Sequence, residues 1–277
     1  MTTQVLRQRA GRASKTYAAT AAGVDPLVFV GAGPGDPELV TRKGWRALEQ
    51  ADVVLHDALL DAAGFREAAP QARWIDVGKR AGRLSTAQGF ITRSLVSLAL
   101  RGFRVVRLKG GDTAIFGRLT EEIQACRQAR IPVQIIPGVT AASSCAAELG
   151  ISLTQRQIAR SVTFLTPRTA HRSQGPTDHW VNSALCSDTV VLYMAGQELP
   201  GLARDLIKRG KSPMTRVALV ESASLQARKL ISTLEQCAIG APVIGSGPVT
   251  IVIGEVVAAA ASESDGAEFA QARREWS

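Results

Sequence analysis

Short apolar runs alternate with helical segments between residues 27 and 136, and this alternation constrains the fold more than any other feature. Runs of four or five residues rich in Val, Ile and Leu, bounded by turn-forming residues, are typical of buried strands. We expect strands at residues 27–30, 53–55, 74–77, 104–108 and 133–136. Strands that alternate with helices form a mostly parallel α/β sheet, which is the fold class we predict.

The strand expected at residues 104–108 runs directly into Lys109-Gly110-Gly111-Asp112. Two glycines let the backbone turn sharply and approach a ligand closely, because no Cβ stands in the way. Open α/β sheets bind their ligands at the carboxyl ends of their strands, where Asp112 is expected. The segment indicates a ligand site, although a tight turn with a surface aspartate explains this piece alone equally well.

A second glycine-rich loop, residues 31–36, follows the first strand. Asp36 can cap a helix that begins at Pro37 and continues to about Gln50. The loop lacks the third glycine of the dinucleotide-binding fingerprint, and Pro34 removes an N–H donor that a pyrophosphate would need. Both departures count against a nicotinamide-dependent oxidoreductase.

Polar residues follow two further strands and a turn. Asp57 ends the second strand, where a carboxylate can bind a ribose, act as a base facing a cleft, or cap the next turn. The third strand leads into residues 78–83, a basic loop that suits carboxylates or phosphates, although such loops are more often simply solvated. Thr140 is a natural cap for a helix of very small residues that starts after residue 140.

The pattern changes after residue 153. Strands are expected at residues 161–165, 189–194, 216–221, 229–233 and 249–253. Fewer and shorter helices join them, which predicts a second α/β domain with a mixed sheet. We place an N-terminal domain at residues 26–138 and a C-terminal domain at residues 139–258. A disordered basic tail (1–25, or alternatively a transit peptide) and a flexible tail (259–277) flank them.

Composition narrows the classes of partner. The net charge of +9, from 33 Lys and Arg against 24 Asp and Glu, fits an acidic partner such as a polycarboxylate, a phosphate or a nucleic acid. An aromatic content of 5% offers no stacking platform for bases, so we do not expect nucleic acid. Four scattered cysteines and three histidines indicate a reducing, cytoplasmic compartment and no metal site. No apolar run reaches the roughly 20 residues of a membrane span.

Six segments in series resemble the tetrapyrrole methylase family, and within it the branch that methylates uroporphyrinogen III. They carry the two glycine-rich loops, the His-Asp strand end, the basic loop, the small-residue helix start and a Leu-Tyr-Met run. The segments are residues 30–41, 51–57, 77–82, 105–112 with 115–118, 136–142 and 192–194.

The resemblance implies a homodimer of two-domain chains, with S-adenosyl-L-methionine bound in the cleft between the domains and S-adenosyl-L-homocysteine released as product. It implies transfer of two methyl groups to uroporphyrinogen III at C2 and C7, giving precorrin-2 by way of precorrin-1. By motif, Asp57 matches the proton acceptor and Lys79 the proton donor. Arg80, Arg83 and Arg118 are suited to bind substrate carboxylates. The cofactor residues carried over are Pro34, Gly110, Gly111, Asp112, Ile115, Thr140, Ala141 and Met194.

Several positions depart from the family pattern and leave other functions open. The changed residues are Thr113, Ala114, Leu119, Thr120, Pro167, Arg168, Ala195 and Ala223. A methyl group where the family has glycine can weaken cofactor binding. The alternatives are a methylase of the same fold that acts on a later precorrin or on RNA, and a paralogue that binds cofactor without turnover.

Overall fold

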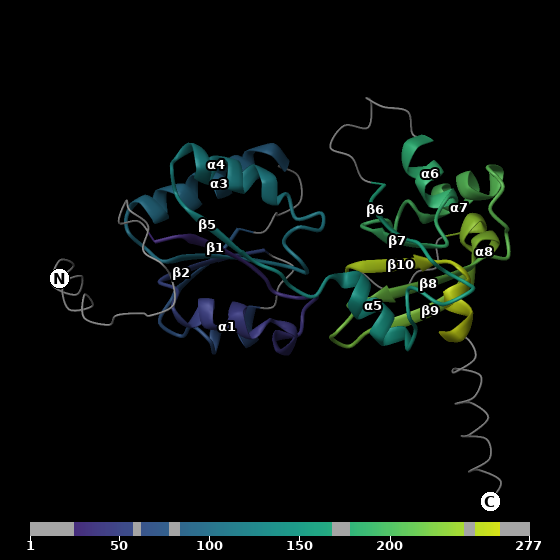
Figure 1. Cartoon of the computed structure of the whole chain (residues 1–277), viewed down its shortest axis with the longest axis horizontal. Coiled ribbons are helices and arrows are strands. Elements are labelled where there is room, and N and C mark those ends of the chain that lie inside the picture. The colour runs from purple at the N-terminus through teal and green to yellow at the C-terminus, as the bar shows by residue number, and fades with distance from the viewer. Residues whose placement is uncertain (1–24, 58–61, 78–83, 168–177, 241–246, 261–277) are drawn as a thin grey trace, which may run out of the picture.

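The computed structural model describes residues 25–57, 62–77, 84–167, 178–240 and 247–260. Within these ranges the chain forms two five-stranded sheets, each covered by helices on both faces (Figure 1). The first sheet ends at Ile136, and the second begins at Val162. The expected boundaries of the two domains stay predictions, and both expected tails lie almost wholly outside the described residues.

The first sheet is entirely parallel, as the alternation of strands and helices predicted. Its strand order is β3-β2-β4-β1-β5. The strands are β1 (Leu27–Gly31), β2 (Val53–His56), β3 (Arg73–Asp76), β4 (Val105–Lys109) and β5 (Val133–Ile136). The helical elements are η1 (Pro37–Leu39), α1 (Arg42–Glu49), α2 (Ala62–Arg66), α3 (Leu84–Leu100) and α4 (Leu119–Gln128).

Alternation along the strands divides the apolar residues of this sheet between its two faces. Phe29 and Leu55 pack with Leu95 of α3 on one side. Val30 and Leu108 belong to the cluster on the opposite side, which contains α1 residues. Figure 1 shows α3 and α4 above the sheet and α1 below it. Because both faces are covered, the strands read as continuous apolar runs rather than alternating ones.

The second sheet is mixed, which confirms the prediction for this half. Its order is β6-β7-β10-β8-β9, and only the β6–β7 pair is parallel among these neighbours. The strands are β6 (Val162–Leu165), β7 (Thr189–Tyr193), β8 (Arg216–Glu221), β9 (Arg228–Thr233) and β10 (Val249–Ile253). The helical elements are α5 (Ala141–Leu149), α6 (Asp178–Leu185), α7 (Leu199–Lys208), α8 (Leu234–Ile239) and η2 (Glu255–Val257). Helices α6, α7 and α8 contribute to one apolar cluster, and α5 contributes to the other.

The continuous helix predicted from Pro37 to Gln50 is wrong, because the segment contains two caps. The Asp36 carboxylate accepts from the Glu38 N–H at 2.8 Å, but the turn it starts ends at Leu39. Val40 is extended and packs against the apolar cluster below the sheet. The Thr41 hydroxyl then accepts from Gly44 N at 3.1 Å and starts α1.

Three glycines allow the ends of neighbouring strands to touch through their backbones. Gly31 ends β1, Gly111 follows β4 and Gly138 follows β5. A Cβ on Gly138 would lie 2.4 Å from Gly111 O and 2.7 Å from Gly31 Cα. A Cβ on Gly31 would lie 2.5 Å from Gly138 N. Real Cβ atoms do not approach backbone this closely, so the sequence must have glycine at Gly31 and Gly138. We call these three residues the glycine junction.

We predict that Gly138→Ala lowers the free energy of unfolding by about 1–3 kcal/mol, because the new methyl group forces backbone atoms apart. Urea denaturation followed by circular dichroism measures the change. Gly201→Ala is the matched control: a Cβ at Gly201 of α7 has no neighbour within 4 Å, and alanine is the better helix former. Equal stability of Gly138→Ala and the wild type would contradict the close contact.

Candidate active site

The two glycine-rich loops of the sequence lie against each other at the carboxyl edge of the first sheet. Gly33 N donates to Gly111 O at 3.2 Å, and Gly111 N donates to Gly33 O at 2.7 Å. Both glycines have positive φ, 76° and 67°, which a residue with a side chain adopts at a cost. This pair of bonds joins the loop that contains Pro34 to the loop that contains Gly110 and Asp112.

Asp112 connects two loops through its carboxylate. One oxygen accepts from Ala114 N at 2.8 Å, and the other accepts from Gly138 N at 2.9 Å. The first bond forms a turn in which Ile115 N also donates to Asp112 O, at 3.3 Å. The second bond draws the loop after β5 toward this turn. In this structure the carboxylate therefore links the loop after β4 to the loop after β5. Its contact with a cofactor stays a prediction.

Tyr193, at the end of β7, joins the second half of the chain to this edge. Its hydroxyl lies 2.7 Å from Thr140 Oγ1 and accepts from Ala142 N at 3.1 Å. Burial, the largest influence, raises the pKa of the Tyr193 hydroxyl, so it stays protonated at neutral pH. Thr140 occupies the N-cap position of α5 as predicted, but its hydroxyl does not cap the helix because it pairs with Tyr193.

Aromatic and polar contacts extend this connection between the halves. The Tyr193 ring lies 5.0 Å from the Phe116 ring and 5.9 Å from the Phe164 ring, centroid to centroid. On the other side, Asp36 N donates to Ser224 Oγ at 3.2 Å, which ties the first glycine-rich loop to the loop after β8. The two sheets therefore contact each other through the same loops that carry the predicted site.

The eight residues predicted to bind cofactor gather here, and none of them is fully buried. Met194 follows Tyr193 directly, is 47% exposed and has a φ of 56°. A left-handed conformation is unusual for methionine and is the kind of strain that clusters at functional sites. The eight residues retain the exposed surface that a ligand site needs, although no bound molecule tests their role.

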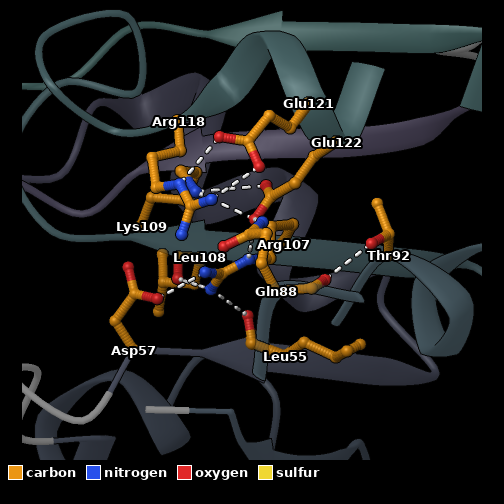
Figure 2. A network of polar contacts seen from close by, with 10 residues as sticks. All are labelled: Leu55, Asp57, Gln88, Thr92, Arg107, Leu108, Lys109, Arg118, Glu121 and Glu122. Carbon is orange, nitrogen blue, oxygen red and sulfur yellow. Dashed lines mark hydrogen bonds and ion pairs between the residues drawn. The ribbon is translucent and has the colours of Figure 1, made fainter. Parts of the chain in front are cut away.

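Asp57 lies at the same edge, at the end of a buried network of charges (Figure 2). Its carboxylate is 34% exposed and forms an ion pair with Arg107, which is 2% exposed. Arg107 Nε also contacts Glu122 Oε1 at 3.4 Å, and Lys109 Nζ contacts both Glu122 oxygens, at 3.2 and 3.1 Å. Burial, then the charge of Arg107, lowers the pKa of Lys109, while Glu122 opposes that change.

Arg118, predicted to bind a substrate carboxylate, is paired with Glu121. Its Nε and Nη2 each donate to one Glu121 oxygen, both at 2.7 Å. The two side chains are 41% and 48% exposed, and exposed pairs contribute little to stability. A substrate carboxylate could therefore replace Glu121 at small cost. Lys79, Arg80 and Arg83 lie outside the described residues, so their placement stays a prediction.

Two of the residues that depart from the family pattern lie in the hydrophobic core. Ala195 and Ala223 are buried, and each belongs to an apolar cluster of the second half. Their additional methyl groups thus form part of the core, which lessens the concern that they obstruct a cofactor. Thr113 is also buried, and its hydroxyl has no hydrogen-bond partner among the described residues. Nothing in the structure explains that choice.

Sequence reasoning missed Tyr193 as a bridge between the halves, and it missed the network behind Asp57. The second omission had a signal. Arg107 and Lys109 are two positions apart in a strand flanked by helices, so both must lie on one buried face. Two buried cations on one face require a carboxylate from the element that covers it, and α4 supplies Glu122.

Comparison with known proteins agrees with this geometry. Residues 26–238 match the family model of tetrapyrrole (corrin/porphyrin) methylases. The siroheme synthase of Zymomonas mobilis is 42% identical over 234 residues, which cover 83% of this chain and 48% of that protein. The chain spans about half the length of such curated relatives.

Solved structures extend the match to three dimensions. Uroporphyrin-III C-methyl transferase from Thermus thermophilus, complexed with S-adenyl homocysteine, superposes with a TM-score of 0.70 at 32% identity. The match covers 84% of this chain and 93% of that one. A cobalt precorrin-4 methyltransferase superposes with a TM-score of 0.70 at 25% identity, over 84% of this chain and 95% of its own. The chain therefore belongs to the tetrapyrrole methylase family.

Proposed function

We propose that the chain transfers two methyl groups from S-adenosyl-L-methionine to uroporphyrinogen III, at C2 and then C7, giving precorrin-2 by way of precorrin-1. One observation carries the proposal: the glycine-rich loops and Asp57 lie at the same carboxyl edge of the first sheet, where a base would face a bound cofactor. Relatives support the substrate, since the Thermus thermophilus structure is that of a uroporphyrin-III methylase. The name siroheme synthase, borne by longer relatives, supports a place in tetrapyrrole synthesis.

The described residues fit S-adenosyl-L-methionine. The glycine junction keeps the strand ends free of side chains, and a Cβ on Gly111 would have open space up to Ala141 N at 4.0 Å. Pro34, Gly110, Asp112 and Ile115 would bind the cofactor from the first half of the chain. Thr140, Ala141 and Met194 would bind it from the α5 and β7 side. The product S-adenosyl-L-homocysteine would leave from the same place.

The cofactor supplies an electrophilic methyl group on a sulfonium, so the protein needs no strong nucleophile. A pyrrole carbon of the reduced macrocycle is enamine-like and attacks by itself once it is aligned. Alignment alone can lower such a barrier by roughly 7–11 kcal/mol. After the carbon is methylated, a proton must leave the ring, and we propose that the Asp57 carboxylate, which is 34% exposed, accepts it. Lys79 is the proposed proton donor.

Charge supports the substrate class. Uroporphyrinogen III carries eight carboxylates, and Arg80, Arg83 and Arg118 are proposed to bind them. The net charge of +9 would attract such a polyanion.

We further propose a homodimer in the cytoplasm, feeding sirohaem or cobalamin synthesis, with neither nucleic acid nor a metal ion as a partner. Among the described residues, none of the helices combines the length and the hydropathy of a membrane-spanning segment.

A methylase that acts on a different methyl acceptor would use the same candidate site. A later precorrin would use the same cofactor residues, and the likeness to a cobalt precorrin-4 methyltransferase favours considering it. A degenerate paralogue would bind cofactor without turnover. Cofactor binding and the number of methyl groups transferred separate these cases from the proposal.

We predict that S-adenosyl-L-homocysteine raises the melting temperature of the purified chain, whereas NAD at the same concentration does not. A ligand that binds the folded state alone, at 100 times its Kd, stabilises it by about 2.7 kcal/mol. Differential scanning fluorimetry measures both ligands. Stabilisation by NAD alone would reverse the cofactor assignment.

We predict that anaerobic incubation with uroporphyrinogen III and S-adenosyl-L-methionine adds two methyl groups, read by mass spectrometry after oxidation. Asp57→Asn should slow the reaction by roughly 100-fold or more, because the carboxylate that accepts the proton is lost. Asp76→Asn is the control, since Asp76 ends the adjacent strand β3 and is exposed. Binding of S-adenosyl-L-homocysteine without any methylation would contradict the proposed substrate.

A further inference from the structure

We propose that Arg107 is a positioning residue, which fixes the orientation of the Asp57 carboxylate, and that Glu122 holds Arg107 in place. This inference rests on the proposed function of Asp57 as proton acceptor. It adds a buried layer behind the site that the family motifs did not single out.

Strand register brings the two residues together. In the parallel β2–β4 pair Leu55 is the partner of Arg107 and His56 is the partner of Leu108. Asp57 is the residue directly after β2, so its side chain emerges beside β4 at the edge of the sheet. The position of Arg107 is therefore set by the backbone pairing of β2 with β4.

The Arg107 guanidinium has acceptors on each of its nitrogens. Nη1 donates to Leu108 O at 2.9 Å and to Leu55 O at 3.3 Å, and Nε contacts Glu122 Oε1 at 3.4 Å. Nη2 donates to the Asp57 carboxylate. Figure 2 shows the guanidinium between Asp57 and Glu122. Two carbonyls and a carboxylate thus fix the plane of the guanidinium, and this orientation directs Nη2 at Asp57.

Glu122 makes it possible to bury two cations behind one exposed carboxylate. It is 1% exposed, and its oxygens accept from Arg107, from Lys109 and from Gln88 Nε2, the last at 3.2 Å. Arg107, Lys109, Glu122 and Asp57 together carry no net charge. Without Glu122, the repulsion between Arg107 and Lys109 would be uncompensated in the core. Asp57 is the member of this set that reaches solvent, so the site sees one carboxylate with a fixed direction.

A network of this kind could instead serve folding stability alone, and kinetic coupling distinguishes the two roles. If Arg107 acts through Asp57, its removal matters only while the carboxylate is present. If Arg107 only stabilises the fold, its removal should cost the same with or without Asp57 and should also disturb cofactor binding.

The experiment is a double-mutant cycle of Arg107→Met and Asp57→Asn. The first-methylation rate is measured in single turnovers with uroporphyrinogen III, and the Kd of S-adenosyl-L-homocysteine is measured by calorimetry. Arg107→Met should slow methylation roughly 10- to 100-fold, within the coupling expected of residues in direct contact, with a Kd within about twofold of wild type. In the Asp57→Asn background the same change should cost less than about twofold. Multiplicative effects, or an unchanged rate in Arg107→Met, would overturn the proposal.

Two further variants distinguish the proposed role of Arg107 from a loss of folding and from the general effect of removing an arginine. Arg107→Lys keeps the positive charge but loses the planar guanidinium, so it should fold even if Arg107→Met proves unstable. Its methylation should still be slower than that of the wild type. Wild-type rate in Arg107→Lys would overturn the proposal.

Arg104→Met is the matched control, because Arg104 precedes β4 and pairs with Asp52 at 2.8 Å, at the opposite ends of the same two strands. It should methylate at the wild-type rate. Failure of the wild type itself to methylate would refute the proposed function, which is a separate outcome.

Discussion

Backbone contact at the ends of β1, β4 and β5 is the constraint on which the site depends. The Gly33–Gly111 hydrogen bonds and the Asp112–Gly138 bond can form only because the glycine junction lets three strand ends touch. These contacts determine where both glycine-rich loops lie, and therefore the shape of the candidate site. The side chains that carry chemistry are then added around a framework made mostly of main chain.

Most of the fold could be predicted from the sequence, because its signals are local. Each strand of the first sheet is a short apolar run bounded by turn residues, and the described strands match the expected ones closely. The prediction failed where two local signals competed. Both Asp36 and Thr41 can cap a helix, and the extended Val40 between them decided in favour of two separate elements.

The candidate site could be predicted only in part. Glycine and aspartate at strand ends indicated its location, since topology alone brings carboxyl ends together. The partners of those residues depend on register and on helix placement, which no short motif encodes. Tyr193 contacts Thr140, and Arg107 contacts Glu122, only because the fold packs different elements against each other. The local sequence around each residue does not indicate its partner. The resemblance suggested roles for residues, and the structure added the buried ion pairs behind Asp57.

The short segment between β5 and α5 is both the covalent link between the sheets and part of the site. Gly138 touches the first half, whereas Thr140 and Ala142 are bonded to Tyr193 of the second. A rotation of one half against the other would disturb these hydrogen bonds. The angle between the two halves and the shape of the candidate site are therefore coupled, because the same few hydrogen bonds set both.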